Sequence, residues 1–141
     1  MRRIVLDTNV LTAGLRSRNG ASFAVLRRIA DKRLRPLVTT ALFLEYEAVL
    51  TRREQGAVHG LSSAELGRLL SGLAALAEPV EVHFLWRPQL HDPKDEMVLE
   101  AAINGRADAL VTHNRRDFLP TAGRFGIEVL GPGELLERLG T

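Results

Sequence analysis

Short apolar runs bounded by polar residues recur along this chain and predict the strands of its sheet. Four of them have the length and continuity of buried strands, and they span residues 4–6, 37–39, 109–112 and 127–130. The third run is fully apolar up to its last residue, which is expected of a strand in the middle of a parallel sheet. Residues 80–85 differ, because apolar and polar side chains alternate there. This alternation predicts a half-solvated strand near an edge of the sheet.

Amphipathic segments between these runs predict helices. The clearest helix follows Ser62 and Glu65, which form a capping box ahead of a stripe of leucines at helical spacing. Another begins with Asp92 as its N-cap and Pro93 as its first residue. The predicted helices span residues 22–32, 41–53, 62–76, 92–105 and 132–140.

Strands and helices alternate with no hairpin signal between neighbouring strands. Such an order implies right-handed crossovers and a parallel sheet that helices cover on both faces. We therefore predict the α/β class and a three-layer α/β/α sandwich. The chain of 141 residues contains no repeat, low-complexity tract or linker, so a single domain over residues 1–141 is expected.

The composition is that of a folded protein, with 45% apolar and 26% charged residues. Cysteine is absent, which excludes disulfides, iron–sulfur clusters and thiolate zinc sites, and suits a reducing cytoplasm. The apolar stretch after Arg2 and Arg3 is broken at Asp7, far short of a signal peptide, and no apolar run is long enough to cross a bilayer. We expect a cytoplasmic protein that does not enter a membrane.

The basic residues are nearly all arginine, with seventeen arginines against Lys32 and Lys94, although the formal net charge is only +2. Arginine forms bidentate contacts with phosphate, so a nucleic-acid partner is one interpretation. A GC-rich genome, which favours arginine codons everywhere, is the other. Composition alone leaves both open.

Acidic residues follow several of the predicted strands. Asp7 stands directly after the first strand, at the edge of the sheet where open α/β folds bind ligands. An ionised carboxylate in that place needs a cation or hydrogen bonds to hold it. The carboxyl ends of parallel strands meet at one edge, where further polar residues are expected to gather: Glu45, Glu47, Asp92, Asp95, Glu96, Asn114 and Asp117.

Structural explanations compete with a site for each of these residues. Asp92 is better explained as a helix cap, and Asp95 would be favoured near the positive end of the same helix in any case. Helical spacing does not decide whether Glu45 or Glu47 points inward. Thr112 has a hydroxyl that can donate to a carboxylate or phosphate, but its segment also reads as an ordinary turn. The recurrence of acids at one edge is what favours a site.

Three converging carboxylates would repel one another and raise their pKa values unless a cation intervened. Ligation by oxygen alone selects a hard ion, Mg²⁺ or Mn²⁺. Such an ion can activate a water molecule for attack on a phosphodiester. The four histidines show no paired spacing for a metal, so zinc is the weaker interpretation.

Four segments together resemble the PIN-domain ribonucleases, in the family's order and over nearly the whole chain. They are Val5-Leu6-Asp7-Thr8-Asn9-Val10-Leu11, Glu45-Tyr46, Asp92-Pro93-Lys94-Asp95 and Ala107-Asp108-Ala109-Leu110-Val111-Thr112. The resemblance implies a Rossmann-like parallel sheet and a metal-dependent endoribonuclease that cleaves RNA. Small members of this family are often VapC-like toxins of type II toxin–antitoxin pairs, so it also implies a cognate antitoxin and a homodimer.

The same resemblance assigns roles to residues. It implies that Asp7, Glu45 and Asp95 bind Mg²⁺ or Mn²⁺, and it selects Glu45 over Glu47. Thr8 and Asn9 would support Asp7, while Thr112 would orient water, phosphate or an acid. Many members carry an aspartate where this chain has Asn114. This difference either weakens the affinity for the metal at that position or makes Asp117 the fourth ligand. Arginines 16, 115 and 116 would contact phosphates.

Two other functions remain as alternatives. Asp7-Thr8-Asn9 after a strand faintly resembles the nucleophile motif of haloacid-dehalogenase-like phosphatases, but the acid expected two residues after the nucleophile is Asn9 here. The second alternative is a catalytically inactive PIN-like binding module, for which Asn114 is the support. The RNA target, the identity of the antitoxin and the number of ions lie beyond what the sequence provides.

Overall fold

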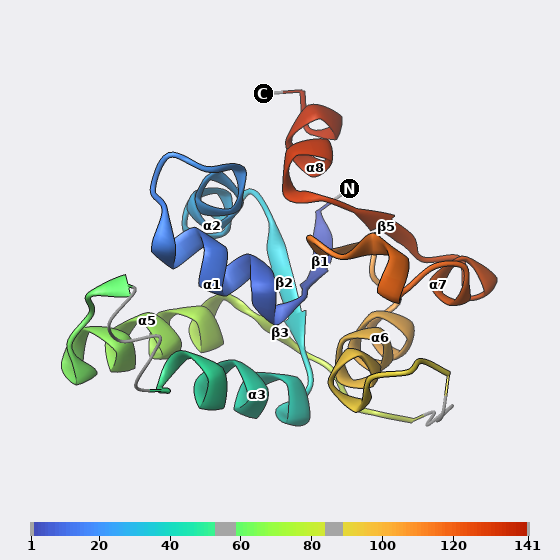
Figure 1. The fold of residues 1–141 in the computed structure, drawn as a ribbon, viewed down its shortest axis with the longest axis horizontal. Coiled ribbons are helices and arrows are strands. Elements are labelled where there is room, and N and C mark those ends of the chain that lie inside the picture. Colours follow the sequence, from blue (N-terminus) through green and yellow to red (C-terminus); the bar gives the residue numbers. More distant parts are fainter. Residues whose placement is uncertain (1, 53–58, 84–88, 141) are drawn as a thin grey trace.

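A five-stranded parallel sheet forms the centre of the molecule in the computed structural model, which describes residues 2–52, 59–83 and 89–140 (Figure 1). The strand order is β3-β2-β1-β4-β5, so the first strand of the chain is the central one. All neighbouring strands run parallel. The strands are β1 (Arg3–Leu6), β2 (Arg35–Val38), β3 (Glu78–Pro79), β4 (Ala109–Val111) and β5 (Glu128–Leu130).

The chain winds from β1 to β2 and β3 in one direction, then returns through a helix to β4 and continues to β5. Right-handed crossovers place helices on opposite faces of a sheet when this direction reverses. The predicted α/β/α sandwich is confirmed. The helices are α1 (Thr8–Arg16), α2 (Ala21–Ala30), α3 (Thr40–Leu50), α5 (Ser63–Leu76), α6 (Pro93–Gly105), α7 (Thr121–Arg124) and α8 (Pro132–Arg138), with a 3₁₀ turn, η1 (Arg115–Asp117).

The interior strands carry the core. All three residues of β4 are fully buried, and so are Ile4 and Val5 of β1, as the apolar run at 109–112 predicted. Helix α6 contacts β1, β2 and β4, while α1 packs against α2, and α2 against α8. Strands buried on both faces leave only their ends free to carry polar chemistry.

The strand predicted over residues 80–85 is wrong where the structure describes it. Pairing with β2 is limited to Glu78 and Pro79, residues 80–83 are not in a strand, and residues 84 and 85 lie outside the described residues. The amide of His83 donates to the side chain of Asn104 instead of a neighbouring strand, at 2.8 Å. The position at the sheet edge is nevertheless as predicted.

Helix α1 was not predicted from the sequence. Thr8, Asn9 and Thr12 are poor helix formers, so local propensity gives little signal there. Packing stabilises the helix instead: Val10 and Leu11 are buried, and α1 lies against α2. The short elements η1 and α7 were also not predicted. The other described helices begin and end within a few residues of the predicted bounds, and both elements of the Ser62 and Glu65 capping box are present.

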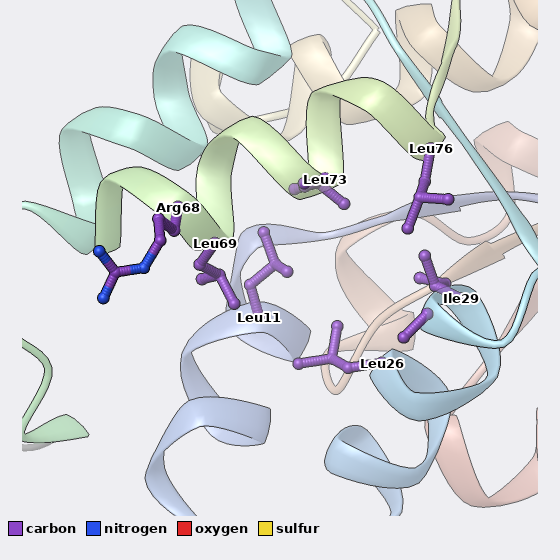
Figure 2. Close-up of a pocket in the computed structure, with 9 residues that line it drawn as sticks. Leu11, Leu26, Ile29, Arg68, Leu69, Leu73 and Leu76 are labelled. Atoms are coloured by element: carbon purple, nitrogen blue, oxygen red, sulfur yellow. The ribbon is translucent and has the colours of Figure 1, made fainter. Parts of the chain in front are cut away.

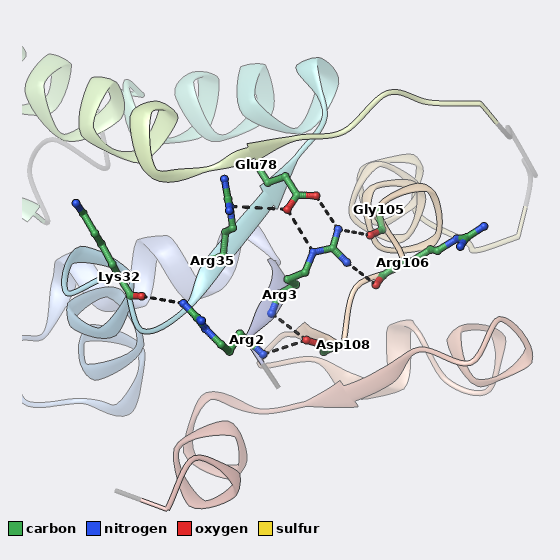
Figure 3. A network of polar contacts seen from close by, with 8 residues as sticks. All are labelled: Arg2, Arg3, Lys32, Arg35, Glu78, Gly105, Arg106 and Asp108. Atoms are coloured by element: carbon green, nitrogen blue, oxygen red, sulfur yellow. Dashed lines mark hydrogen bonds and ion pairs between the residues drawn. The ribbon is translucent and has the colours of Figure 1, made fainter.

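Polar contacts fasten the amino-terminal edge of the sheet (Figure 3). The guanidinium of Arg3 donates to Glu78 at 2.6 Å and to the carbonyls of Gly105 and Arg106 at 2.7 and 3.1 Å. The backbone amide of Arg3 donates to the carboxylate of Asp108 at 3.0 Å. These contacts tie β1 to β3 and to the loop before β4, so the register of the central strands is fixed from the end opposite to the acids.

Candidate functional site

Strand register brings Asp7 and Thr112 together. Leu6 lies opposite Val111 in the β1–β4 pair, so the next residue of each strand emerges at the same carboxyl edge. The hydroxyl of Thr112 donates to Oδ2 of Asp7 at 2.7 Å and accepts from the amide of Asn114 at 3.0 Å. Thr112 is fully buried, and Asp7 is only 9% exposed. The sheet thus places one carboxylate and its hydroxyl donor in a fixed arrangement.

Burial raises the pKa of Asp7 above its ordinary value. The hydrogen bond from Thr112 and the backbone amide of Thr8 lower this pKa, while the nearby charge of Asp117 raises it. Asp7 occupies the N-cap position of α1. Its carboxylate accepts from the hydroxyl of Thr112 and lies beside the first amides of α1, so the residue joins the edge of the sheet to the start of the helix.

Helix α3 presents Glu45 to the same edge. Tyr46 is 1% exposed and donates its hydroxyl to the carbonyl of Leu6, which anchors α3 to β1. With Tyr46 held in the core, the Glu45 side chain is 15% exposed and lines a cavity with Asp7. Glu47 is exposed and lines a different hollow beside α5. The structure therefore shows that Glu45 faces the cavity beside Asp7 and Glu47 does not, a distinction that helical spacing could not make.

The first turn of α6 contributes Asp95. The helix starts as predicted, because Oδ1 of Asp92 accepts from the amide of Lys94 at 2.9 Å and Pro93 is its first residue. The pKa of Asp95 is raised from 3.8 to about 6, first by burial and then by the charges of Asp7 and Asp92, with Asp117 also contributing. Negative charge around Asp95 is therefore incompletely compensated.

A cavity of about 280 Å³ joins these residues. The predicted site residues Asp7, Glu45 and Asp95 all line it, and Thr112 stands behind Asp7. The described residues that line it are Asp7, Thr8, Asn9, Thr12, Glu45, Val49, Asp92, Lys94, Asp95, Asn114 and Asp117. Sequence reasoning did not single out Thr12, Val49 or Lys94. Thr12 lies one turn after Thr8, a relation visible only once residues 8–16 are assigned to a helix.

The donors around this cavity are carboxylate, amide and hydroxyl oxygens, which fit a hard divalent cation and not a soft one. Within the described residues, no three histidine, aspartate or glutamate side chains already stand close enough to hold a metal ion together. The ammonium of Lys94 lies 4.0 Å from Oε1 of Glu45. The acids thus surround one space and are partly compensated from within the chain, and closing on an ion would require side-chain movement.

The arginines expected near phosphate are placed differently from one another. Arg16 is exposed at the last residue of α1 and does not line the cavity. Arg115 is paired with Glu134 of α8 at 2.8 Å. Arg116 lines a neighbouring cavity that shares Asp95 with the first. Of the three, Arg116 is the one placed beside the acids.

A separate, apolar hollow lies among α1, α2 and α5 (Figure 2). It measures about 230 Å³ and its side chains point toward one another from the three helices. Leucine and isoleucine dominate its lining, and the described residues include a single charged one; they are Leu11, Leu26, Ile29, Ala30, Arg68, Leu69, Gly72, Leu73 and Leu76. We call this hollow the apolar groove.

Comparisons with known proteins agree with the fold. A family model for the PIN domain matches residues 3–116. The structure of FitAB bound to the IR36 DNA fragment aligns with a TM-score of 0.60 and 17% identity, covering 92% of this chain and 94% of that one. VapBC2 from Rickettsia felis, bound to a DNA fragment from its promoter, aligns with a TM-score of 0.57 and 15% identity, covering 92% and 98%.

Searching the curated proteins gave no significant match to this sequence. None of the helices in the described ranges has the length and apolarity that a membrane crossing requires. At identities of 15% and 17%, the two structural neighbours establish the fold.

Proposed function

Because this chain belongs to the PIN-domain family, a family of nucleases, we propose that it is a metal-dependent endoribonuclease acting on RNA in the cytoplasm. The observation that carries the proposal is the cavity where Asp7, Glu45 and Asp95 meet from three separate elements. Each of these carboxylates has a structural reason to be where it is. Their convergence on one space does not follow from any of those reasons.

We assign Asp7, Glu45 and Asp95 to a Mg²⁺ or Mn²⁺ ion, with Asp117 as a further acid at the rim. When bound, such an ion supplies an activated water and charge stabilisation for phosphodiester hydrolysis. Thr112 holds the Asp7 carboxylate in place through its hydroxyl. Asn114 contributes a neutral amide, which lowers the total negative charge that a phosphate must approach.

Cleavage of single-stranded RNA with Mn²⁺, with and without EDTA, tests the proposal. We expect cleavage by the wild type to require the ion, and we expect the Asp7→Asn variant to lose cleavage. Asp31→Asn is the matched control, because Asp31 is an exposed aspartate at the end of α2, outside the cavity. Cleavage that persists in EDTA, or full activity of Asp7→Asn, would contradict the mechanism.

We further propose that the chain is the toxin of a type II toxin–antitoxin pair and forms a homodimer. The support is the fold shared with FitAB and VapBC2, both solved as complexes on DNA. The apolar groove offers an antitoxin segment a surface apart from the acids, because its leucines face a common space. A small DNA-binding protein encoded beside this gene would be the expected partner.

Mixing the chain with that neighbouring protein should suppress RNA cleavage. Leu69→Glu, on the rim of the apolar groove, should keep cleavage and lose the suppression. Leu44→Glu is the control, because Leu44 is 55% exposed on α3 and does not line the groove. Equal suppression of both variants would mean that the antitoxin binds a surface other than the apolar groove. Light scattering of the free chain would test the homodimer.

The inactive binding module remains the second candidate, since Asn114 replaces an acid that many family members carry. Calorimetric titration with Mn²⁺ separates the two functions. Binding that Asp7→Asn abolishes favours the enzyme, and the absence of binding by the wild type favours the module. The phosphatase alternative would require a phosphoaspartate at Asp7, with Asn9 standing where its acid is needed.

A further inference from the structure

A second cavity adjoins the cluster of acids on the side of α7. It measures about 370 Å³, within the range of roughly 300–1,000 Å³ typical of small-molecule pockets. Asp92, Asp95 and Asp117 line both cavities, so the two spaces adjoin at these carboxylates. The second cavity is lined in addition by Gln89, Leu90, His91, Arg116, Leu119, Pro120 and Thr121.

One wall of this cavity is held by a buried acid. Glu96 is 4% exposed, and its Oε1 accepts from the backbone amides of Gln89 and Leu90 at 2.6 and 2.8 Å. A buried carboxylate that receives two backbone donors fixes the segment that donates them. The segment leading to His91 is therefore fastened to α6, the same helix that carries Asp95.

The opposite wall is equally fixed. Phe118 is fully buried, and the amide of Leu119 donates to the carbonyl of Arg115 at 3.1 Å. Beside these anchors, the Leu119 side chain is 49% exposed. A large apolar side chain held open to solvent in a cavity offers a surface to a flat apolar partner, such as the face of a base.

The charges of the cavity are unequal. Among the described residues, three carboxylates line it and Arg116 is its one arginine. In the described part of the chain no ion pair joins Arg116 to a carboxylate, whereas its neighbour Arg115 is engaged by Glu134. A guanidinium in this position can form charge-assisted hydrogen bonds with a phosphate.

We propose that this cavity binds the nucleotide next to the scissile phosphodiester, with Arg116 contacting its phosphate and with His91 and Leu119 contacting its base. The proposal rests on the proposed ribonuclease function and extends it to the substrate. Contacts to phosphates give affinity, whereas contacts to bases give specificity. Arg116 therefore supplies affinity for any sequence, while His91 and Leu119 determine which base is accepted. His91 and Leu119 therefore select the cleavage site, and Arg116 strengthens binding at it.

Binding of the four ribonucleoside 5′-monophosphates, followed by NMR in the presence of Mg²⁺, tests the subsite without relying on cleavage. We expect the signals of His91, Leu119 and Thr121 to shift on titration. Arg116→Ala should weaken binding about tenfold or more, as expected from the loss of a hydrogen bond between charged groups. Arg124→Ala, at the exposed end of α7 and outside the cavity, should leave binding unchanged.

Cleavage of RNAs randomised around the cut provides the second measurement. Leu119→Ala and His91→Ala should change the preferred base beside the cut, whereas Leu44→Ala should not. Unmoved signals at His91 and Leu119, or equal binding by Arg116→Ala and Arg124→Ala, would overturn the subsite even if the wild type cuts RNA. If the wild type binds nucleotides at these residues but cuts no RNA, the proposed ribonuclease function is refuted and the nucleotide-binding site is supported.

Discussion

Replacing Asp95 by asparagine should stabilise the metal-free protein at neutral pH, although we assign Asp95 to the metal site. The reason is the environment of its carboxylate. Burial and the charges of Asp7, Asp92 and Asp117 raise its pKa from 3.8 to about 6, so the folded chain holds an unfavourable charge above that pH. Asparagine keeps the shape of the side chain and removes the charge.

The magnitude follows from two opposing effects. A pKa that rises from 3.8 to about 6 corresponds to about 3 kcal/mol against the charged form, at about 1.36 kcal/mol per pKa unit. Asp95 is only partly buried, and solvent screening reduces this to about 1–2 kcal/mol. Loss of a favourable charge in the first turn of α6 costs about 0.5 kcal/mol. We expect a net gain of about 1 kcal/mol, or roughly 3–5 °C in Tm.

The pH dependence gives the sign of the effect. Between about pH 4 and 6 the Asp95 carboxyl keeps its proton in the folded chain but has released it in the unfolded chain. The loss of folding free energy caused by the Asp95 charge therefore grows as the pH rises and is complete above about 6. The gain from Asp95→Asn should therefore be full at neutral pH, shrink as the pH falls through 6 and disappear near pH 4. Thermal denaturation in EDTA, followed by circular dichroism at each pH, measures it.

Mn²⁺ should reverse the ranking. On the proposed function, the ion should stabilise the folded wild type by binding to it, and Asp95→Asn should lose most of this gain because it lacks a ligand. Asp31→Asn removes the same charge at an exposed position and should keep the wild-type response to Mn²⁺. A metal-free Asp95→Asn protein that is less stable than the wild type at pH 7, or one that gains as much from Mn²⁺, would refute the reasoning.

Two substitutions test the supports of the site, and a third tests the packing of α6 against β2. Thr112→Val removes the hydroxyl that donates to Asp7 and should cost about 1–3 kcal/mol by denaturant titration, with cleavage lost, whereas Thr112→Ser should restore both. Tyr46→Phe leaves the carbonyl of Leu6 without its buried donor and should cost about 1–2 kcal/mol, measured in the same way. Gly105→Ala would place a methyl carbon 2.9 Å from a leucine side chain of β2 and should lower the free energy of unfolding by about 1–3 kcal/mol.

The gathering of acids could be predicted because it depends on topology and not on side-chain detail. Parallel strands carry their carboxyl ends to one edge, so Asp7 and the segment after Val111 had to be neighbours once the strands were identified. Glu45 needed more than topology. Its orientation depends on Tyr46, which is anchored to the carbonyl of Leu6 across forty residues of sequence, a contact that helical periodicity does not encode.

Other features were missed because their signals are tertiary. Helix α1 contains threonine, asparagine and glycine, and it is stabilised by contact with α2; a Cβ on Gly14 would lie only 2.6 Å from the side chain of Leu26. Strand β3 is only two residues long, Glu78 and Pro79, and its last hydrogen bond to β2 runs from the amide of Val80 to the carbonyl of Val38. The alternation at residues 80–85 resembled a strand, yet Val80 packs on the core, while Val82 is 44% exposed and pairs with no strand in the described part of the chain.

The acids around the cavity are only partly compensated by cations of the chain itself. Asp7 is stabilised by neutral donors, a hydroxyl and backbone amides, which hold its carboxylate without cancelling its charge. Among the described residues, Glu45 is the acid of this cavity that has a cation nearby, and that cation is Lys94 at 4.0 Å. Lys94 and Asp95 are adjacent in the first turn of α6. This turn therefore places two groups at the cavity: the carboxylate of Asp95, and the ammonium of Lys94, which would compete with a metal ion for Glu45. A divalent ion that displaces this ammonium would gain Glu45 as a ligand and relieve the repulsion at Asp95 in one step, which couples metal binding to the position of a lysine.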